Sequence, residues 1–399
     1  MKILIMRASN TKNYGSLMMV ANYIRVFKSK YPKSTFIVDN VEIDGVERIK
    51  ASSGVEEIES FLELGIQLRP DCSNENSFNK LIKYSKYSLS FGRMMKDIGV
   101  DRVIQLGGDD FSEYYSIKAL CIELLKIESL LKNNIKVQLL GQTMGPFYSW
   151  RKWWIKKLLN KVSIYSRDEN SAKYLIEELQ LKNVKIAADL AYLPLYKQDT
   201  SYFENFPEHK LGSFKDYFVI VPSGLWKSYT SDLDSYVNSY LSLINHLTER
   251  GENVLILSHV LSDTSSDNKI IEKIQERIEH SPKVKFIKET LLPVEARALI
   301  AKSKCVVSGR MHACVSALQV GVPAVPLSYS VKFKGVIGEL NIIDRIIDSV
   351  GDDLWRLDGK ASPIVNSILS EIDSLESTHD KTSVLSQIQA LEHKILTQF

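Results

Sequence analysis

Residues 305–335 read CVVSGRMHACVSALQVGVPAVPLSYSVKFKG, and their pattern decides the fold. The apolar run at 305–307 has the length of a buried strand, and apolar residues recur with helical spacing over 313–320. A Gly-Val-Pro turn then leads into a second strand-length run at 324–327. A strand, a crossover helix and a second strand predict one βαβ unit of a parallel sheet.

The same alternation of strand-length and helix-period segments runs through most of the chain. It predicts an α/β protein with two Rossmann-like, doubly wound domains. We expect the domains to face a central cleft, because open parallel sheets bind ligands at the carboxyl ends of their strands. The predicted strands are 2–6, 36–39, 103–106, 137–141, 163–166 and 184–187, then 217–221, 254–258, 284–287, 305–308 and 324–327. The predicted helices of the first half are 16–30, 77–96, 114–132 and 171–179.

The domain boundary is predicted where this periodicity is lost. Charged residues collect before residue 216, with breakers at Pro207 and Gly212. The expected parts are an N-terminal domain (1–195), a linker (196–215), a C-terminal domain (216–360) and C-terminal helices that pack back across the junction (361–399).

Composition and charge exclude several classes of protein. Of the 399 residues, 44% are hydrophobic and 25% are charged, as in globular rather than disordered proteins. With 51 Lys and Arg against 48 Asp and Glu, the net charge is only +3, so we expect no nucleic acid partner. No apolar run approaches the roughly 20 residues that cross a bilayer, and the N-terminus is a poor signal peptide. The four cysteines lack the spacing of a zinc site or a disulfide scaffold. We expect a cytoplasmic protein with reduced thiols that acts on small molecules.

The turn before the helix at 313–320 carries the best candidates for chemistry. Arg310, Met311 and His312 lie between a strand end and a helix start, where unpaired backbone amides favour an anion. A guanidinium suits a carboxylate or phosphate, and an imidazole donates and accepts protons near neutral pH. The alternative is that Arg310 makes an ion pair at the sheet edge and that a backbone carbonyl satisfies His312.

Other polar residues follow further strands of the same predicted sheet. Lys332 follows the run at 324–327 and is a candidate phosphate ligand, the alternative being a solvated surface lysine. Ser223 and His259 also follow predicted strands and are candidate ligand contacts. The alternative for both is an ordinary loop role.

Taken together, these motifs resemble the polysaccharide pyruvyl transferase family, whose members are similar in fold to GT-B glycosyltransferases. The resemblance covers about residues 1–345. The residues that carry it are Arg310-Met311-His312, Gly321-Val322-Pro323, Tyr329 and Lys332, with Gly141-Gln142, Gly145-Pro146, Arg167-Asp168, Ser171, Asp189, Asn13 and Gly15.

The resemblance implies phosphoenolpyruvate as the donor substrate, no cofactor or metal, and a sugar with two suitably placed hydroxyls as the acceptor. Arg310 would hold the donor's carboxylate or phosphate, and His312 would be the general acid that protonates its methylene carbon. A sugar hydroxyl would then attack C2, phosphate would leave, and a second hydroxyl would close a cyclic ketal. The remaining donor-binding candidates are Met311, Lys332, Ser223 and His259.

Two departures from the family pattern fall in the half that is expected to meet the acceptor. Many relatives have Asp at the position of Ser16. Many also have a run of glycines where this chain has two glycines followed by Asp109 and Asp110. The candidate acceptor-binding residues are Asn13, Gly15, Ser16, Asp109 and Asp110. For the aspartates the alternative is capping of a helix that begins near residue 113, and for Ser16 it is an N-cap.

A basic aromatic segment lies outside these motifs. Trp150, Trp153 and Trp154 alternate with Lys and Arg over 150–161, on a predicted helix. This pattern is typical of segments at an anionic membrane surface, where the protein would meet a lipid-linked oligosaccharide acceptor. The alternative is a surface helix whose tryptophans pack on the sheet.

The sequence therefore favours a cytoplasmic pyruvyl transferase, peripheral at the inner face of the membrane, that acts on a sugar of a cell-surface polysaccharide precursor. Two alternatives stay open. One is a GT-B glycosyltransferase that uses a nucleotide-diphosphate sugar, and the other is a glycan-binding protein without catalytic activity.

Overall fold

The chain forms two compact units, each built on one parallel β-sheet. The structure is a computed structural model, and it describes all residues except 74, 114–115, 263–264, 279–280, 341–344 and 398. The first unit comprises Met1–Thr11, Met19–Leu190 and Lys394–Phe399, and the second comprises Lys12–Met18 and Ala191–His393. No helix among the described residues is long and apolar enough to span a membrane.

The elements of the first unit alternate between strand and helix. Its strands are β1 (Lys2–Met6), β2 (Thr35–Val38), β3 (Ile58–Ser60), β4 (Arg102–Phe111), β5 (Lys136–Met144), β6 (Ser163–Ser166) and β7 (Val184–Ile186). Its helices are α1 (Tyr14–Lys30), of which Tyr14 to Met18 group with the second unit, α2 (Gly45–Ser53), α3 (Ser77–Asp97), α4 (Ile117–Lys132), α5 (Ser149–Leu159) and α6 (Glu169–Lys173).

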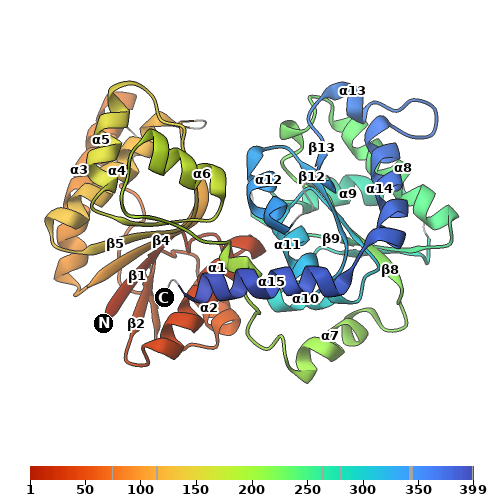
Figure 1. The fold of residues 1–399 in the computed structure, drawn as a ribbon, viewed down its shortest axis with the longest axis horizontal. Coiled ribbons are helices and arrows are strands. Elements are labelled where there is room, and N and C mark those ends of the chain that lie inside the picture. Colours follow the sequence, from red (N-terminus) through yellow and green to blue (C-terminus); the bar gives the residue numbers. More distant parts are fainter. Residues whose placement is uncertain (74, 114–115, 263–264, 279–280, 341–344, 398) are drawn as a thin grey trace. The chain divides into compact units, whose positions relative to one another are not determined.

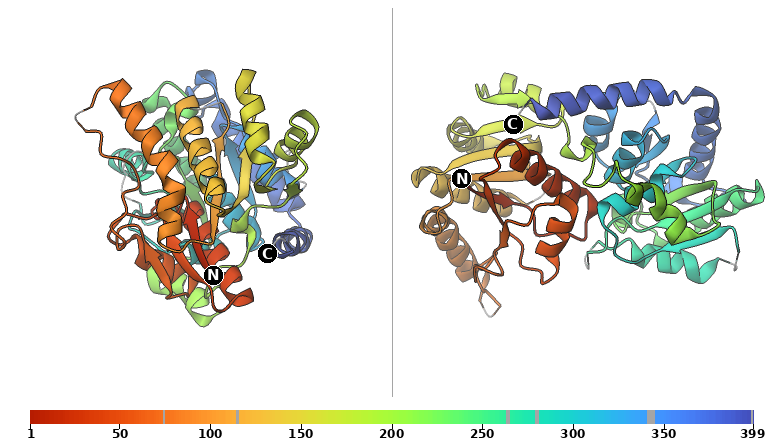
Figure 2. Two further views of the ribbon diagram at one scale, coloured as in Figure 1. Left: turned by 90° about the vertical axis from the view of Figure 1, so that its left-hand side faces the viewer. Right: turned by 90° about the horizontal axis from the view of Figure 1, so that it is seen from below.

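The first sheet is doubly wound. Within the described chain its seven strands run in the order β3-β2-β1-β4-β5-β6-β7, which reverses between β1 and β4. Helices α3, α4 and α5 lie side by side on one face of the sheet, and α1 and α2 cover the other (Figures 1 and 2). Because both faces are covered, strand residues such as Ile3, Leu4 and Ile5 are fully buried.

The elements of the second unit follow the same pattern. Its strands are β8 (Tyr217–Val221), β9 (Asn253–Leu257), β10 (Val284–Ile287), β11 (Val306–Ser308), β12 (Ala324–Ser328) and β13 (Ile347–Asp348). Its helices are α7 (Ser201–Leu211), α8 (Leu233–Glu249), α9 (Asn268–Arg277), α10 (Pro293–Ala301), α11 (Met311–Gln319), α12 (Val331–Ile337), α13 (Asp352–Trp355), α14 (Pro363–Thr378) and α15 (Lys381–Leu396).

The second sheet is also doubly wound. Among the described residues it has six parallel strands in the order β10-β9-β8-β11-β12-β13, with the reversal between β8 and β11. Helices α8 and α14 pack together on one side, and α10 packs against both α7 and α11 (Figure 1). The largest buried side chain, Trp355, contacts the rings of Tyr236 and Tyr240 in this unit's core.

The observed parts differ from the expected domain ranges in two places. The range 196–215, expected as a linker, contains α7 and belongs to the second unit. Residues Lys12–Met18 group with the second unit although β1 belongs to the first. For the C-terminal helices, which were expected to pack back across the junction, Lys394–Phe399 group with the first unit.

Candidate active site

Polar loops follow four neighbouring strands of the second sheet. Ser223 follows β8, His259 follows β9, Arg310 follows β11 and Lys332 follows β12. Because these strands are parallel, their carboxyl ends meet at one edge of the sheet, and β8 and β11 flank the reversal point where such sheets bind ligands. The structure therefore places the predicted donor-binding residues at one edge of one unit.

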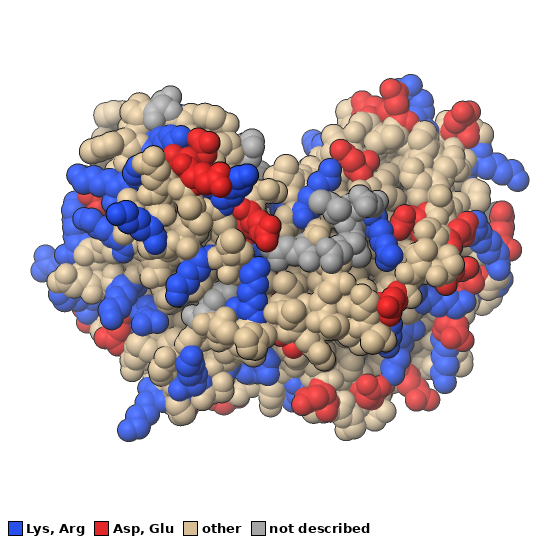
Figure 3. Space-filling view, in the orientation of Figure 1, with Lys and Arg blue, Asp and Glu red and all other residues tan. Residues whose placement is uncertain are grey.

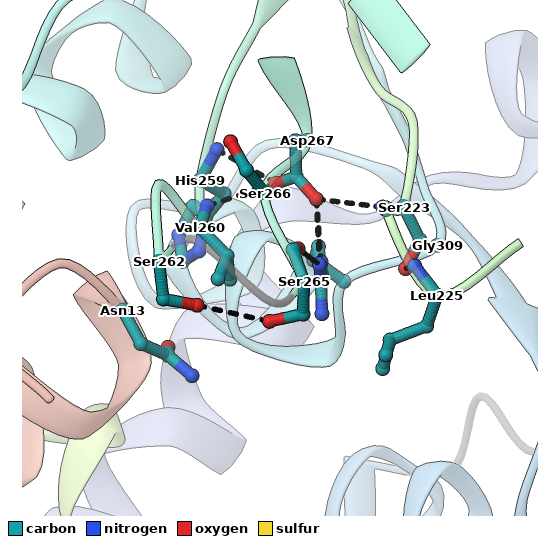
Figure 4. Close-up of polar contacts among 12 residues, drawn as sticks. Asn13, Ser223, Leu225, His259, Val260, Ser262, Ser265, Ser266, Asp267 and Gly309 are labelled. Carbon is teal, nitrogen blue, oxygen red and sulfur yellow. Dashed lines mark hydrogen bonds and ion pairs between the residues drawn. The ribbon is translucent and has the colours of Figure 1, made fainter. Parts of the chain in front are cut away.

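Asp267 joins three of these loops. Its side chain is fully buried. One carboxylate oxygen accepts hydrogen bonds from the backbone nitrogen of Gly224 (2.8 Å) and from Nε (2.8 Å) and Nη2 (2.7 Å) of Arg310. The other accepts from the backbone nitrogens of His259 (3.0 Å) and Val260 (2.8 Å). Figure 4 shows the carboxylate of Asp267 in the middle of these contacts, so it fixes the three loops relative to one another.

Arg310 is held by groups of its own unit. Its side chain is only 10% exposed, and Nη2 also donates to the carbonyl oxygen of Ser265 (2.5 Å). Burial works to lower the pKa of Arg310, but the adjacent Asp267 carboxylate outweighs burial and raises the pKa, so the guanidinium stays charged. The structure thus contains the ion pair that was the alternative interpretation of Arg310, and this pair carries no net charge.

His312 packs against the backbone of Gly15. It lies half-buried in the first turn of α11. A Cβ atom on Gly15 would lie 2.0 Å from Nδ1 and 2.4 Å from Cγ of His312, so only glycine leaves room for the imidazole. Since Gly15 groups with the second unit, a predicted acceptor-binding residue contacts the predicted general acid.

Asn13 fixes the start of α1 beside this contact. Its Oδ1 accepts from the backbone nitrogens of Gly15 (3.1 Å) and Ser16 (3.4 Å). Asn13 rather than Ser16 therefore caps the helix, because it directly precedes the first helical residue, and Ser16 lies in the first turn. All three residues lie in the second unit and not in the N-terminal domain to which the sequence analysis assigned them.

His259 is a buried, neutral histidine. Its ring packs edge-to-face on Tyr14, with ring centroids 5.2 Å apart. Burial, and then the nearby charges of His312, Arg310 and Arg297, hold the pKa of His259 well below its ordinary value. The ring contributes packing rather than positive charge at neutral pH.

Lys332 is positioned by an aromatic pair. Its Nζ lies 2.6 Å from the hydroxyl oxygen and 4.6 Å from the ring centroid of Tyr329. Tyr329 packs edge-to-face on the buried Tyr229, whose hydroxyl donates to the carbonyl oxygen of Gly309 (2.8 Å). The segments after β11 and β12 are therefore joined, and Lys332, in the first turn of α12, follows the strand next to the one that Arg310 follows.

Ser223 and Met311 have buried side chains. The hydroxyl of Ser223 is fully buried and accepts a hydrogen bond from the backbone nitrogen of Leu225 (3.2 Å). Met311, the first residue of α11, is 5% exposed, so its side chain packs in the interior. For Ser223 this matches the ordinary loop role.

Asp109 and Asp110 lie inside β4, which continues to Phe111. The predicted strand ended at residue 106, which would place both aspartates after it, and this expectation is wrong. The structure describes their place in β4 but not their side chains. They do not cap a helix near residue 113, because α4 begins at Ile117 and the hydroxyl of Ser116 caps it by accepting from the backbone nitrogen of Ala119 (3.3 Å).

Two motif residues of the first unit have structural partners. Arg167 donates from Nη1 to the buried carboxylate of Asp189 at 2.8 Å. Asp168 caps α6 by accepting from the backbone nitrogen of Ser171 at 2.8 Å. In the part of the chain that the structure describes, no three His, Cys, Asp or Glu side chains are grouped to hold a metal ion.

Sequence reasoning missed Asp267, Tyr14 and Tyr229. Asp267 precedes α9 and has the sequence signal of a helix cap, yet its side chain makes no capping bond. Its carboxylate instead binds residues that are 7, 8 and 43 positions away in the chain. No local pattern contains that information.

Comparisons with known proteins match most of the chain and its fold. The model of the family described as "Polysaccharide pyruvyl transferase" matches residues 13–331. The amylovoran biosynthesis protein AmsJ of Erwinia amylovora is 22% identical over 315 residues, which are 75% of this chain and 72% of that protein.

Solved structures with the same fold are much less similar in sequence. UDP-GlcNAc 2-epimerase from Neisseria meningitidis has a TM-score of 0.59 at 11% identity, with 100% of both chains covered. UDP-N-acetylglucosamine 2-epimerase from Rickettsia bellii has a TM-score of 0.58 at 13% identity, covering 100% of this chain and 95% of that one. The predicted fold class, two doubly wound α/β sheets of the GT-B-like type, is confirmed.

Proposed function

The chain belongs to the polysaccharide pyruvyl transferase family, and we propose that it transfers the pyruvyl group of phosphoenolpyruvate to a sugar of a cell-surface polysaccharide precursor. Family membership makes the protein a transferase. The similarity to an amylovoran biosynthesis protein supports a polysaccharide precursor as the acceptor. The observation that carries the donor proposal is the packing of His312 on Gly15, two residues from Arg310 and its ion pair with Asp267.

Phosphoenolpyruvate carries a carboxylate and a phosphate, so its site needs hydrogen-bond donors and positive charge. The Arg310–Asp267 pair is neutral as a whole, which leaves the charge of Lys332 and the positive end of the α11 dipole to attract the anion. Asp267 and Ser265 hold the guanidinium in a fixed orientation. We assign the carboxylate of phosphoenolpyruvate to Arg310. We assign its phosphate to Lys332 and the start of α11.

The proposed reaction needs one acid and two sugar hydroxyls. His312, as imidazolium, gives its proton to the methylene carbon C3, which makes C2 electrophilic. The first hydroxyl adds to C2 and returns its proton to His312. The C2–O bond to phosphate then breaks, the second hydroxyl adds to C2, and its proton leaves with the phosphate. The products are a cyclic ketal and inorganic phosphate, and the atoms balance without another reactant.

His312 suits the acid role better than His259. It is half-buried, whereas His259 is fully buried and neutral. A positioned acid typically contributes about 10²- to 10⁴-fold in rate. The cationic groups stabilise the charge that develops on the departing phosphate.

The acceptor is proposed to be a sugar, free or attached to a lipid-linked oligosaccharide, whose hydroxyls reach C2 beside His312. Ser16 is next to Gly15 in the first turn of α1 and is our candidate for the contact with an acceptor hydroxyl. Asp109 and Asp110 stay acceptor candidates by position in β4. We propose that the reaction takes place in the cytoplasm, at the inner face of the membrane.

The test is incubation of the purified protein with phosphoenolpyruvate and candidate sugars. We expect phosphate release together with a sugar product that has gained a pyruvyl ketal. His312→Ala should lose turnover, and the matched control His209→Ala, an exposed histidine of α7, should keep it. Consumption of a nucleotide-diphosphate sugar without use of phosphoenolpyruvate would show a glycosyltransferase instead. Glycan binding without turnover in either form would show a non-catalytic protein.

A further inference from the structure

Large apolar side chains are exposed at the beginnings of three neighbouring helices of the first unit. Phe78 is 70% exposed, and Trp150 and Trp153 are each 67% exposed. We name as the helix-start patch the exposed residues Phe78, Leu81 and Ile82 of α3, Ile117 of α4, and Tyr148, Trp150 and Trp153 at and after the N-cap of α5.

The topology brings these helix beginnings together. In a parallel sheet every crossover helix starts at the carboxyl edge of the strands, so α3, α4 and α5 all begin at the same edge. The three helices lie side by side on one face of the sheet (Figure 2). Trp150 and Trp153 are one turn apart on α5, and Leu81 and Ile82 lie one turn after Phe78 on α3. On each of these two helices the exposed apolar residues are therefore neighbours, and the helix beginnings lie along one edge of the sheet.

Cations accompany the patch and acids are scarce. Residues 77–97 contain five Lys or Arg and one acid, Asp97 at the far end of α3, while 149–161 contain five Lys or Arg and no acid. Lys157 lies 5.1 Å from the ring centroid of Trp153. Figure 3 shows Lys and Arg side chains gathered over the part of the first unit where these helices lie.

Among the described residues, acidic groups of neighbouring segments also contact this region. Glu113 is nearly buried and paired with Arg151, which holds the pKa of Glu113 below its ordinary value. Glu178 pairs with Lys152 (3.6 Å), and Glu75 pairs with Lys83 (2.7 Å), while Asp71 accepts from Ser73. The surface keeps an excess of positive charge after these pairs are counted.

We propose that the helix-start patch docks on an anionic lipid bilayer. Tryptophan and tyrosine favour the boundary between lipid headgroups and acyl chains, and lysines beside them attract anionic headgroups. The sequence predicted a membrane contact through Trp150, Trp153 and Trp154. The structure leaves Trp154 out of this contact, because Trp154 is half-buried and packs against the core, and the next residue, Ile155, is fully buried. Trp150 and Trp153 make the contact, and the opposite side of α5 stays packed on the sheet.

The test is sedimentation of the full chain with vesicles of phosphatidylcholine alone and with vesicles in which half of the lipid is phosphatidylglycerol. We expect binding only to the anionic vesicles, and loss of binding at high salt. The double variant Trp150→Ala, Trp153→Ala should bind at least tenfold more weakly, and each lysine of α5 changed to Gln should cost about fivefold. Tyr196→Ala is the matched control, because Tyr196 is an exposed aromatic with Lys197 5.4 Å from its ring centroid in the second unit.

Two outcomes would overturn the proposal. One is no binding by the unchanged protein, which together with a dimer that the tryptophan variant dissociates would assign the patch to a second copy of the chain. The other is equal binding to both kinds of vesicle. Thermal unfolding of the variants should match the unchanged protein, since both tryptophans are exposed. Phosphate release with a water-soluble acceptor should also be unchanged, which separates failure of this proposal from failure of the proposed function.

Discussion

Replacing Gly15 by Ala is the most informative perturbation of the site. The added Cβ would lie 2.0 Å from Nδ1 of His312, and ordinary contact begins at about 3.4 Å, so the imidazole must move by more than 1 Å. A shift of about 1 Å in a reacting group costs on the order of 10²-fold in rate. We expect Gly15→Ala to lower phosphoenolpyruvate-dependent phosphate release about 100-fold.

The stability change of this variant separates crowding from helix propensity. Alanine is favoured over glycine in a helix by up to about 1 kcal/mol, whereas overpacking costs about 1–3 kcal/mol. In a His312→Ala background the crowding is gone, and Gly15→Ala should be neutral or stabilising. The double-mutant cycle should therefore give a coupling of about 1–3 kcal/mol between Gly15 and His312.

Urea denaturation of the four proteins measures this coupling, and phosphate release measures activity. Unchanged activity of Gly15→Ala with a coupling below about 0.5 kcal/mol would refute the contact between the two residues.

Three further predictions concern the same cluster. Asp267→Ala leaves the buried guanidinium of Arg310 unpaired and should lower the free energy of unfolding by about 3–5 kcal/mol; a loss under about 1 kcal/mol in urea denaturation would contradict the three-loop junction. His312→Ala should reduce phosphate release about 10²- to 10⁴-fold while phosphoenolpyruvate still raises its melting temperature, and loss of that protection would assign His312 to binding. Because the pKa of His259 is depressed in the folded state, the unfolded state alone binds a proton below about pH 6.5, so stability should fall as pH drops below that value. Denaturation at several pH values checks this, and His259→Asn should remove that part of the slope.

Strands of the sheet centres could be predicted from sequence because they are buried on both faces. Tyr217 to Val221 is an uninterrupted apolar run, and the structure gives β8 the predicted bounds. The two strands that sequence reasoning missed, β3 (Ile58–Ser60) and β13 (Ile347–Asp348), lie at sheet edges and are only three and two residues long, too short to show a hydrophobic pattern.

The end of β4 differs from the predicted strand. That strand was expected to end at residue 106, but β4 continues through Gly107 and Gly108 to Phe111. A Cβ on Gly107 would lie 2.3 Å from the carbonyl oxygen of Gly141 in β5, so glycine is required there by the close approach of two strands. This requirement depends on the partner strand and is invisible in the local sequence.

The site itself was only partly predictable. Strand ends correctly located Arg310, His312 and Lys332 at one sheet edge. The partner of Arg310 lies 43 residues away in the chain, and the segment around Asn13 groups with a sheet that begins about 200 residues later. Contacts of this kind come from the packing of loops, which residue spacing does not encode.

The most direct measurement is the reaction in D₂O, with the product's pyruvyl methyl group examined by mass spectrometry and NMR. If His312 donates the proton to C3 of phosphoenolpyruvate, the ketal methyl should carry one solvent-derived deuterium, and His312→Ala should form this product at a strongly reduced rate. A sugar product without a pyruvyl group, formed from a nucleotide sugar while phosphoenolpyruvate stays unconsumed, would contradict the account.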